Sequence, residues 1–125
     1  MKVGVTGTRK GITTQQTQKF LEIMNQMNPT EFHHGGCKGA DLELAQITEE
    51  MFGAKIVLHL PLITESKYYL KRNREIIERC NILLAFPSLK HEVIRSGTWY
   101  TIRYAKRVHR KTKIIYPDGS VEDVN

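Results

Sequence analysis

Short apolar runs alternate with longer segments of helical periodicity along this chain. The runs that predict strands cover residues 2–6, 31–34, 55–60, 82–86 and 113–116. Apolar residues that recur every three or four positions follow the first four runs and predict helices over residues 13–28, 40–53, 70–81 and 98–109. This alternation is typical of a parallel sheet that is covered by helices on both faces.

Local signals define several of these elements. Thr13, with Gln16 three residues later, forms a capping box that begins the first helix. Residues 82–86 are continuously apolar, as expected of a strand that is buried on both faces. Residues 88–95 show no period and are long for a loop between a strand and a helix, so we interpret them as a mobile flap over a site. The tail after residue 116 is polar, and its Asp118-Gly119 turn signal indicates a terminal hairpin.

The fold class predicted from this order is α/β. We expect a single Rossmann-like three-layer domain over residues 1–125, with a five-stranded, mainly parallel sheet in the order 3-2-1-4-5. In such a sheet the connection reverses between strands one and four, and ligands bind at the carboxyl ends of the strands around that point.

Three turns rich in glycine and small hydroxyl residues follow strands one, two and four. They cover residues 7–11, 35–39 and 96–98, and each opens a predicted helix. The topology brings them to one rim of the sheet, where backbone N–H groups and helix N-termini bind anions. A phosphate-bearing small molecule, most simply a nucleotide derivative, is therefore the predicted ligand, and no cofactor is expected.

Each of these features also has a purely structural explanation. The glycines of residues 35–39 can serve only to permit positive φ angles in a tight turn. Asp41 can stabilise its helix through the macrodipole, and Thr98 can cap its helix through its hydroxyl. Arg9 and Arg72 can pair with phosphate or simply remain solvated.

The composition favours an anionic partner but does not identify it. The formal net charge of +6 comes from nineteen Lys and Arg against thirteen Asp and Glu, and it favours anionic partners. Six basic residues fall within eleven positions: Arg103, Lys106, Arg107, Arg110, Lys111 and Lys113. This run fits either a solvated helix face or contact with nucleic acid. No segment approaches the roughly 18 apolar residues of a membrane span, and no cleavable leader is evident, so we expect a cytoplasmic protein.

The chain offers no convincing metal site. Cys37 and Cys80 are too few for a disulfide framework or a zinc cluster, and we expect free thiols. His33, His34 and His59 lack metal-ligand spacing with either cysteine, so we interpret them as structural histidines.

The motifs together resemble a known superfamily. The residues concerned are Gly4-Val5-Thr6-Gly7-Thr8-Arg9, the Gly-Gly-Cys-Lys-Gly-Ala-Asp turn at 35–41, Arg72-Asn73, residues 82–87, Ser96-Gly97-Thr98-Trp99 and Ile102-Arg103-Tyr104-Ala105. Neither the P-loop ending nor the dinucleotide fingerprint is present. The set resembles the SLOG superfamily over about residues 2–116. That group is Rossmann-like and includes the DNA-processing protein A domain, the lonely-guy phosphoribohydrolases and sensor domains for nucleotide-derived signals.

The resemblance implies particular roles and one departure. Gly97 and Thr98 match the step that grips a phosphate in the phosphoribohydrolases, and Arg72 matches the arginine near the glycosidic bond. Those enzymes carry a glutamate three residues after the threonine, where this chain has Thr101. Asp41, Glu65 and Glu92 are the carboxylates that would have to replace it, and no catalytic residue is assigned. Related enzymes form dimers, which makes a homo-oligomer possible.

Three functions follow from these observations. The favoured one is a sensor or sequestering domain that binds a nucleotide or an ADP-ribose-type molecule. The alternatives are an N-glycosidase acting on nucleoside monophosphates, and a single-stranded nucleic-acid binder, whose basic helix carries few aromatic residues besides Tyr100 and Tyr104. The predicted ligand-binding residues are Gly7, Thr8, Arg9, Gly35, Gly36, Gly39, Asp41, Arg72, Asn73, Ser96, Gly97 and Thr98.

Overall fold

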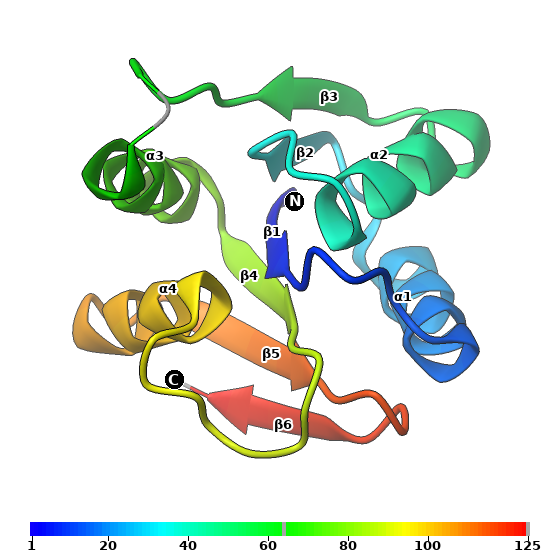
Figure 1. The fold of residues 1–125 in the computed structure, drawn as a ribbon. Coiled ribbons are helices and arrows are strands. Elements are labelled where there is room, and N and C mark those ends of the chain that lie inside the picture. The colour runs from blue at the N-terminus through cyan, green and yellow to red at the C-terminus, as the bar shows by residue number, and fades with distance from the viewer. Residues whose placement is uncertain (64, 125) are drawn as a thin grey trace.

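A computed structural model describes residues 1–63 and 65–124, which form one six-stranded sheet between two layers of helices (Figure 1). The strand order is β3-β2-β1-β4-β5-β6. Their bounds are β1 (Lys2–Gly7), β2 (Glu31–His34), β3 (Lys55–Leu58), β4 (Ile82–Phe86), β5 (Lys111–Ile115) and β6 (Val121–Val124). The first five strands pair in parallel, and β6 pairs antiparallel with β5.

Two helices cover each face of the sheet. The helices are α1 (Thr14–Met27), α2 (Ala40–Met51), α3 (Ser66–Arg79) and α4 (Gly97–Arg107). In Figure 1, α1 and α2 lie on one side of the strands, and α3 and α4 lie on the other. None of the helices in the described part of the chain has the length and apolar character needed to cross a membrane.

The central strand β4 packs against both helical layers. Leu84 and Phe86 belong to the cluster formed with α1 and α2, whereas Leu83 and Ala85 pack with α3 and α4. All five residues of β4 are buried. This confirms the prediction drawn from its uninterrupted apolar run, because a strand covered on both faces needs apolar side chains at odd and even positions alike.

The predicted fold class and the order of the first five strands are confirmed, but the strand count was wrong by one. The sixth strand, β6, pairs antiparallel with β5 across the Asp118-Gly119 turn, so the expected terminal hairpin forms and adds one strand to the sheet. It is exposed along most of its length, so it has almost no apolar signal. The backbone ladder to β5 holds it, helped by the hydrogen bond from the Tyr116 hydroxyl to Glu122 Oε1 at 2.6 Å.

The buried side chain of Gln16 fastens α1 to the carboxyl ends of the central strands. Its Nε2 donates to the carbonyls of Pro87 at 3.0 Å and Ile115 at 2.9 Å. Its Oε1 accepts from the Thr13 amide at 3.0 Å, which completes the predicted capping box. Gln16 therefore does more than cap its helix, because it also fixes the start of the loop that connects β4 to α4.

Replacing Gln16 by alanine is expected to lower the free energy of unfolding by about 2–4 kcal/mol. The change leaves two buried carbonyls and one helix-terminal amide without their partner, and each unsatisfied buried group costs about 1–3 kcal/mol. Chemical denaturation measures the effect. Gln18→Ala on the exposed face of the same helix is the matched control, expected within about 0.5 kcal/mol of wild type. Equal stability of the two variants would contradict this role of Gln16.

Candidate functional site

A cavity of about 440 Å³ lies at the carboxyl ends of β1 and β4. Its walls come from the loop after β1, the turn after β2, the first half of α3, and the loop that leads from β4 into the start of α4. This is the point at which the strand order reverses, so the cavity lies where an open parallel sheet places its ligand.

The structure brings most of the predicted ligand-binding residues to this cavity, which we call the switch-point cavity. Nine of the twelve line it: Gly7, Thr8, Arg9, Asp41, Arg72, Asn73, Ser96, Gly97 and Thr98. Gly35 and Gly36 instead line a smaller neighbouring cavity of about 320 Å³, together with Lys38. Gly39 lines neither cavity. The binding of a ligand by these residues stays a prediction.

Two of the glycines are explained by close packing. Gly39 has a φ angle of +88°, and a Cβ there would overlap the Thr8 carbonyl. That carbonyl accepts a hydrogen bond from the Ala40 amide at 2.9 Å, which anchors the start of α2 to the turn after β1. A Cβ at Gly35 would overlap the guanidinium of Arg72. Both positions therefore need glycine whether or not a ligand binds.

Arg72 is a buried structural brace as well as a cavity-lining residue. It is 4% exposed, and its Nη1 donates to the carbonyls of Gly35 at 2.5 Å and His59 at 3.1 Å. Its Nε donates to Asn73 Oδ1 at 2.9 Å, and its Nη2 donates to Cys37 Sγ at 3.5 Å. These bonds use four of the five N–H groups of the guanidinium. Arg72 thereby ties α3 to the ends of β2 and β3, with one N–H left for a ligand.

Asp41 is the acidic residue at the floor of the cavity. It is 5% exposed, and its Oδ2 accepts from the Gly35 amide at 2.8 Å. Burial raises the pKa of this carboxyl, although the hydrogen bond from Gly35 and the nearby charge of Arg72 act in the opposite direction. Of the three carboxylates considered for glycosidic cleavage only Asp41 lines the switch-point cavity, because Glu65 and Glu92 are not among its lining residues.

Thr101 stands where the phosphoribohydrolases carry their glutamate, and its hydroxyl is already engaged. It donates to the Gly97 carbonyl at 2.9 Å and accepts from Asn73 Nδ2 at 2.9 Å. Position 101 therefore joins α4 to α3 and supplies no charge to the cavity. The geometry adds no support for N-glycosidase chemistry.

The start of α4 offers the cavity donors without internal partners. Ser96, not Thr98, is the N-cap, and its Oγ accepts from the Trp99 amide at 3.3 Å. The Thr98 side chain is about nine-tenths buried, and its hydroxyl has no hydrogen-bond partner within residues 1–63 and 65–124. The amides of Gly97 and Thr98, in the first turn, have no helical acceptor. This combination is suited to an anion.

Two cavity residues that were not predicted change its chemistry. The Tyr69 ring lies 5.4 Å from the guanidinium carbon of Arg9 and 5.6 Å from that of Arg72, both cation–π distances. Lys10 adds a second exposed cation beside Arg9. Tyr69 precedes Arg72 by three residues, so helical spacing alone places the two on one face of α3, a signal that could have identified it.

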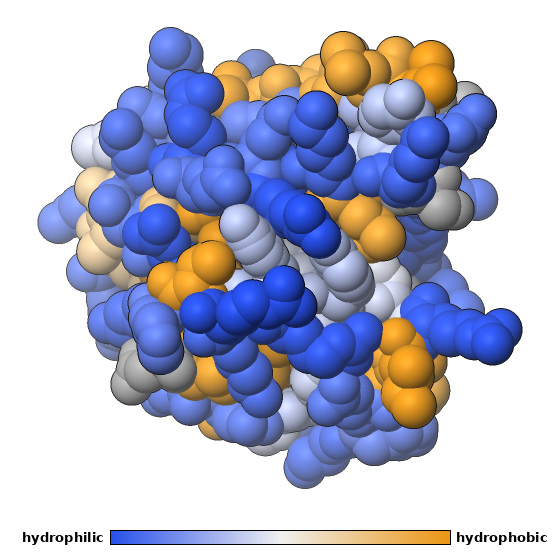
Figure 2. Space-filling view, turned by 90° about the vertical axis from the view of Figure 1, so that its left-hand side faces the viewer, coloured by the Kyte–Doolittle hydropathy of each residue, from blue (hydrophilic) through white to orange (hydrophobic). Residues whose placement is uncertain are grey.

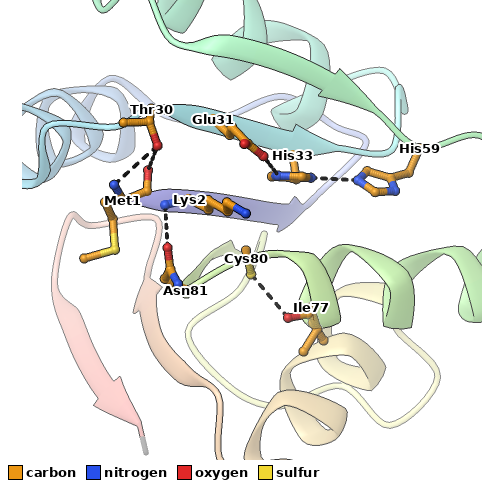
Figure 3. A network of polar contacts seen from close by, with 9 residues as sticks. All are labelled: Met1, Lys2, Thr30, Glu31, His33, His59, Ile77, Cys80 and Asn81. Atoms are coloured by element: carbon orange, nitrogen blue, oxygen red, sulfur yellow. Dashed lines mark hydrogen bonds and ion pairs between the residues drawn. The ribbon is translucent and has the colours of Figure 1, made fainter.

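A line of polar contacts joins one carboxylate and two imidazoles. His33 Nε2 is 2.8 Å from Glu31 Oε1, and its Nδ1 is 2.8 Å from His59 Nε2, so the three side chains form one line (Figure 3). The His59 carbonyl then accepts from Arg72, which connects this line to the cavity. No group of three or more His, Cys, Asp or Glu side chains with metal-binding geometry occurs among the described residues.

Comparisons with known proteins place the chain by its fold. No protein-family model and no curated protein sequence matches it. The crystal structure of DNA processing protein A from Streptococcus pneumoniae matches with a TM-score of 0.72 and 17% identity, covering 90% of this chain and 49% of that one. DNA processing protein A from Helicobacter pylori, whose structure is described for its single-stranded DNA binding mode, matches with a TM-score of 0.68 and 16% identity.

These matches confirm the Rossmann-like fold that the resemblance implies. The match to the Helicobacter pylori protein covers 91% of this chain and 64% of that one. This chain therefore spans about half of the Streptococcus pneumoniae structure and just under two thirds of the Helicobacter pylori structure. At this level of identity the likeness extends to the fold alone.

The three buried histidines, His33, His34 and His59, predict that the free energy of unfolding falls at pH values well above those at which carboxylates titrate. Burial lowers the pKa values of His33, His34 and His59 below the ordinary 6.5. Below about pH 6.5 the unfolded chain therefore binds more protons than the folded chain. We expect the free energy of unfolding, measured by urea denaturation, to fall between about pH 7 and pH 5, by up to about 1.4 kcal/mol per pH unit for each imidazole.

Two variants test the assignment of this slope. His33→Asn removes one buried titrating group and is expected to flatten the pH dependence, whereas His91→Asn on the exposed loop is expected to leave it unchanged. Protonation of Asp41, whose pKa is raised, acts in the opposite direction at the acid end. A wild-type stability that is constant across this window would show that the imidazoles are not held neutral by the fold.

Proposed function

We propose that this chain binds single-stranded nucleic acid at the switch-point cavity, with a backbone phosphate at the start of α4 and an adjoining base against Tyr69. One observation carries the proposal: phosphate-binding donors without internal partners lie in the same cavity as an accessible aromatic ring. The fold supports it, since one protein that shares this fold is described as binding single-stranded DNA.

The proposed phosphate-binding part of the site consists of groups that have few or no hydrogen-bond partners within the described protein. The first-turn amides of α4 and the Thr98 hydroxyl lie at the cavity, and none of them has an acceptor within the helix. Arg9, in the turn after β1, lines the same cavity. Arg9 makes no ion pair in the described part of the chain, and its one polar contact is a long one to Cys37 Sγ at 3.9 Å. A phosphate would therefore not have to displace a carboxylate from it.

The base half of the site rests on Tyr69. Stacking on an aromatic ring tolerates every base and contributes about 1–3 kcal/mol per base in single-strand binders. The ring is half-buried on the first turn of α3, beside two guanidiniums, so its position is already restricted. A duplex cannot present an unstacked base to such a ring, which favours a single strand.

Apart from Arg103, the basic run that first suggested nucleic acid does not line this site. Helix α4 begins at the cavity and runs away from it, so its last turn, with Lys106 and Arg107, lies at the opposite end of the strands, near the start of β5 (Figure 1). The cations that line this cavity and its two neighbours are Arg9, Lys10, Lys38, Arg72, Arg95 and Arg103. The proposal depends on these and not on the distal run.

A mononucleotide or ADP-ribose-type ligand is the second candidate, and the shape of the cavity favours it. A volume of about 440 Å³ falls within the range of about 300–1,000 Å³ that is usual for small-molecule pockets. Isothermal titration with AMP and ADP-ribose tests this candidate. Tight binding of either, together with no binding of an oligonucleotide, would establish it in place of the single strand.

Fluorescence anisotropy with a labelled oligothymidine of about 20 nucleotides tests the first candidate. We expect binding that weakens steeply with salt, because each neutralised phosphate contributes a slope of about −0.7 to log K against log salt. Arg9→Ala removes a charge-assisted contact and is expected to weaken binding by roughly 10- to 100-fold.

The matched control is Arg107→Ala in the distal basic run, expected within about twofold of wild type at the same salt concentration. Circular dichroism checks that both variants fold. The proposal fails if the wild-type chain does not bind the oligonucleotide, or if Arg107→Ala weakens binding while Arg9→Ala does not.

A further inference from the structure

A second cavity, of about 300 Å³, adjoins the switch-point cavity on the side of α4. The two share five lining residues, so they meet along the start of α3 and α4: Arg9, Tyr69, Leu70, Ser96 and Gly97. The second cavity adds Ile94, Arg95 and Tyr100, which belong to the end of the β4–α4 loop and the first turns of α4. A ligand that extends beyond the switch-point cavity therefore has a preformed path across the start of α4.

Tyr100 presents an aromatic ring to this second cavity and is fixed by its neighbour on α3. Its hydroxyl accepts from Arg74 Nε at 2.8 Å and also from Arg74 Nη2. The guanidinium carbon of Arg74 lies 5.6 Å from the centroid of the Tyr100 ring. A ring already restricted in this way loses little conformational entropy when a planar group stacks on it.

The two arginines of the second cavity have different tasks. Arg103 is occupied, since its Nη1 pairs with Glu92 at 2.6 Å and its Nη2 donates to the Ile94 carbonyl at 2.9 Å, which holds the loop in place. Arg95 is exposed and forms no ion pair with the described residues. Besides Arg9, which lines both cavities, Arg95 is therefore the cation of this cavity that remains available for a phosphate.

The surrounding surface fits a polar, charged ligand. Figure 2 shows the side of the molecule on which α3 and α4 lie, and hydrophilic residues cover most of it. Apolar groups lie along its upper border and in smaller patches across the rest of the face. The second cavity combines an aromatic ring, a free guanidinium and the exposed side chain of Ile94, a set that can contact both the base and the phosphate of one nucleotide.

We propose that the second cavity is a second nucleotide subsite, in which Tyr100 stacks on a base and Arg95 pairs with the adjoining phosphate. This inference rests on the proposed function, because it extends the strand bound at the switch-point cavity by one unit. Arg9 and Tyr69 lie between the two subsites, so consecutive nucleotides pass on either side of them.

The test compares two tyrosines of the same helix for binding of the labelled oligothymidine. Tyr100→Ala is expected to weaken binding by roughly 5- to 100-fold, the range that corresponds to the loss of one stacked base. Tyr104→Ala is the matched control: Tyr104 also contacts Arg74, at 5.3 Å, but does not line the cavity, and we expect affinity within about twofold of wild type. Tyr100→Phe keeps the ring and is expected to retain most of the affinity.

A second measurement does not depend on Tyr100. Arg95→Gln is expected to reduce the salt slope by about 0.7, the contribution of one phosphate contact to a single strand. If circular dichroism shows that Tyr100→Ala does not fold, Tyr100→Leu keeps apolar bulk on α4 without an aromatic face and takes its place.

The outcomes separate this inference from the function on which it rests. If Arg9→Ala weakens binding while Tyr100→Ala and Arg95→Gln both match wild type, the second subsite is overturned and the proposed function stands. If wild type does not bind the oligonucleotide, the proposed function fails and the subsite fails with it. Weakening by Tyr100→Ala but not by Tyr104→Ala supports both.

Discussion

The buried guanidinium of Arg72 is the interaction on which the functional end of this fold depends. A charge that is 4% exposed is costly unless its donors are satisfied, and here two backbone carbonyls, an amide oxygen and a thiol satisfy them. The two carbonyls belong to Gly35 and His59, at the ends of β2 and β3. One side chain thus fixes the distance between α3 and two strand ends, and with it the width of the cavity.

The residues that line the cavity fall into two sets: those whose polar groups are bonded within the protein, and those whose polar groups remain free for a ligand. Arg72, Asn73 and Asp41 line the cavity, yet their polar groups bind chiefly one another and the backbone. Arg9, Thr98 and the first-turn amides of α4 have few such bonds or none in the described chain. Because a group that is already satisfied gains little from a new partner, the free set is the one that can contribute net binding energy.

Sequence reasoning reached the fold more completely than the site. The capping box at Thr13 and the uninterrupted apolar run of β4 are local signals, and both elements formed where expected. Strand β6 was not counted because backbone pairing holds it, and backbone pairing leaves no apolar pattern in the sequence. The internal use of Arg72 and Asn73 was likewise hidden, since it depends on which carbonyls lie beside α3 once the sheet has formed. Tyr69 was not predicted either, although its helical spacing from Arg72 was a signal that could have identified it.

The net charge of the chain is another property that the sequence gives without locating the binding site. A value of +6 identifies an anion as the preferred class of partner, but it does not locate the contact. The densest basic run lies in the last turn of α4 and the start of β5. Because α4 begins at the cavity and runs away from it, these residues lie far from the cavity. Across one domain width, charges separated by solvent and salt interact weakly, because the screening length is only about 8 Å at physiological ionic strength. Under the proposed function, the distal cations would contribute only to long-range attraction, and the few cations at the rim of the cavity would make the direct contacts.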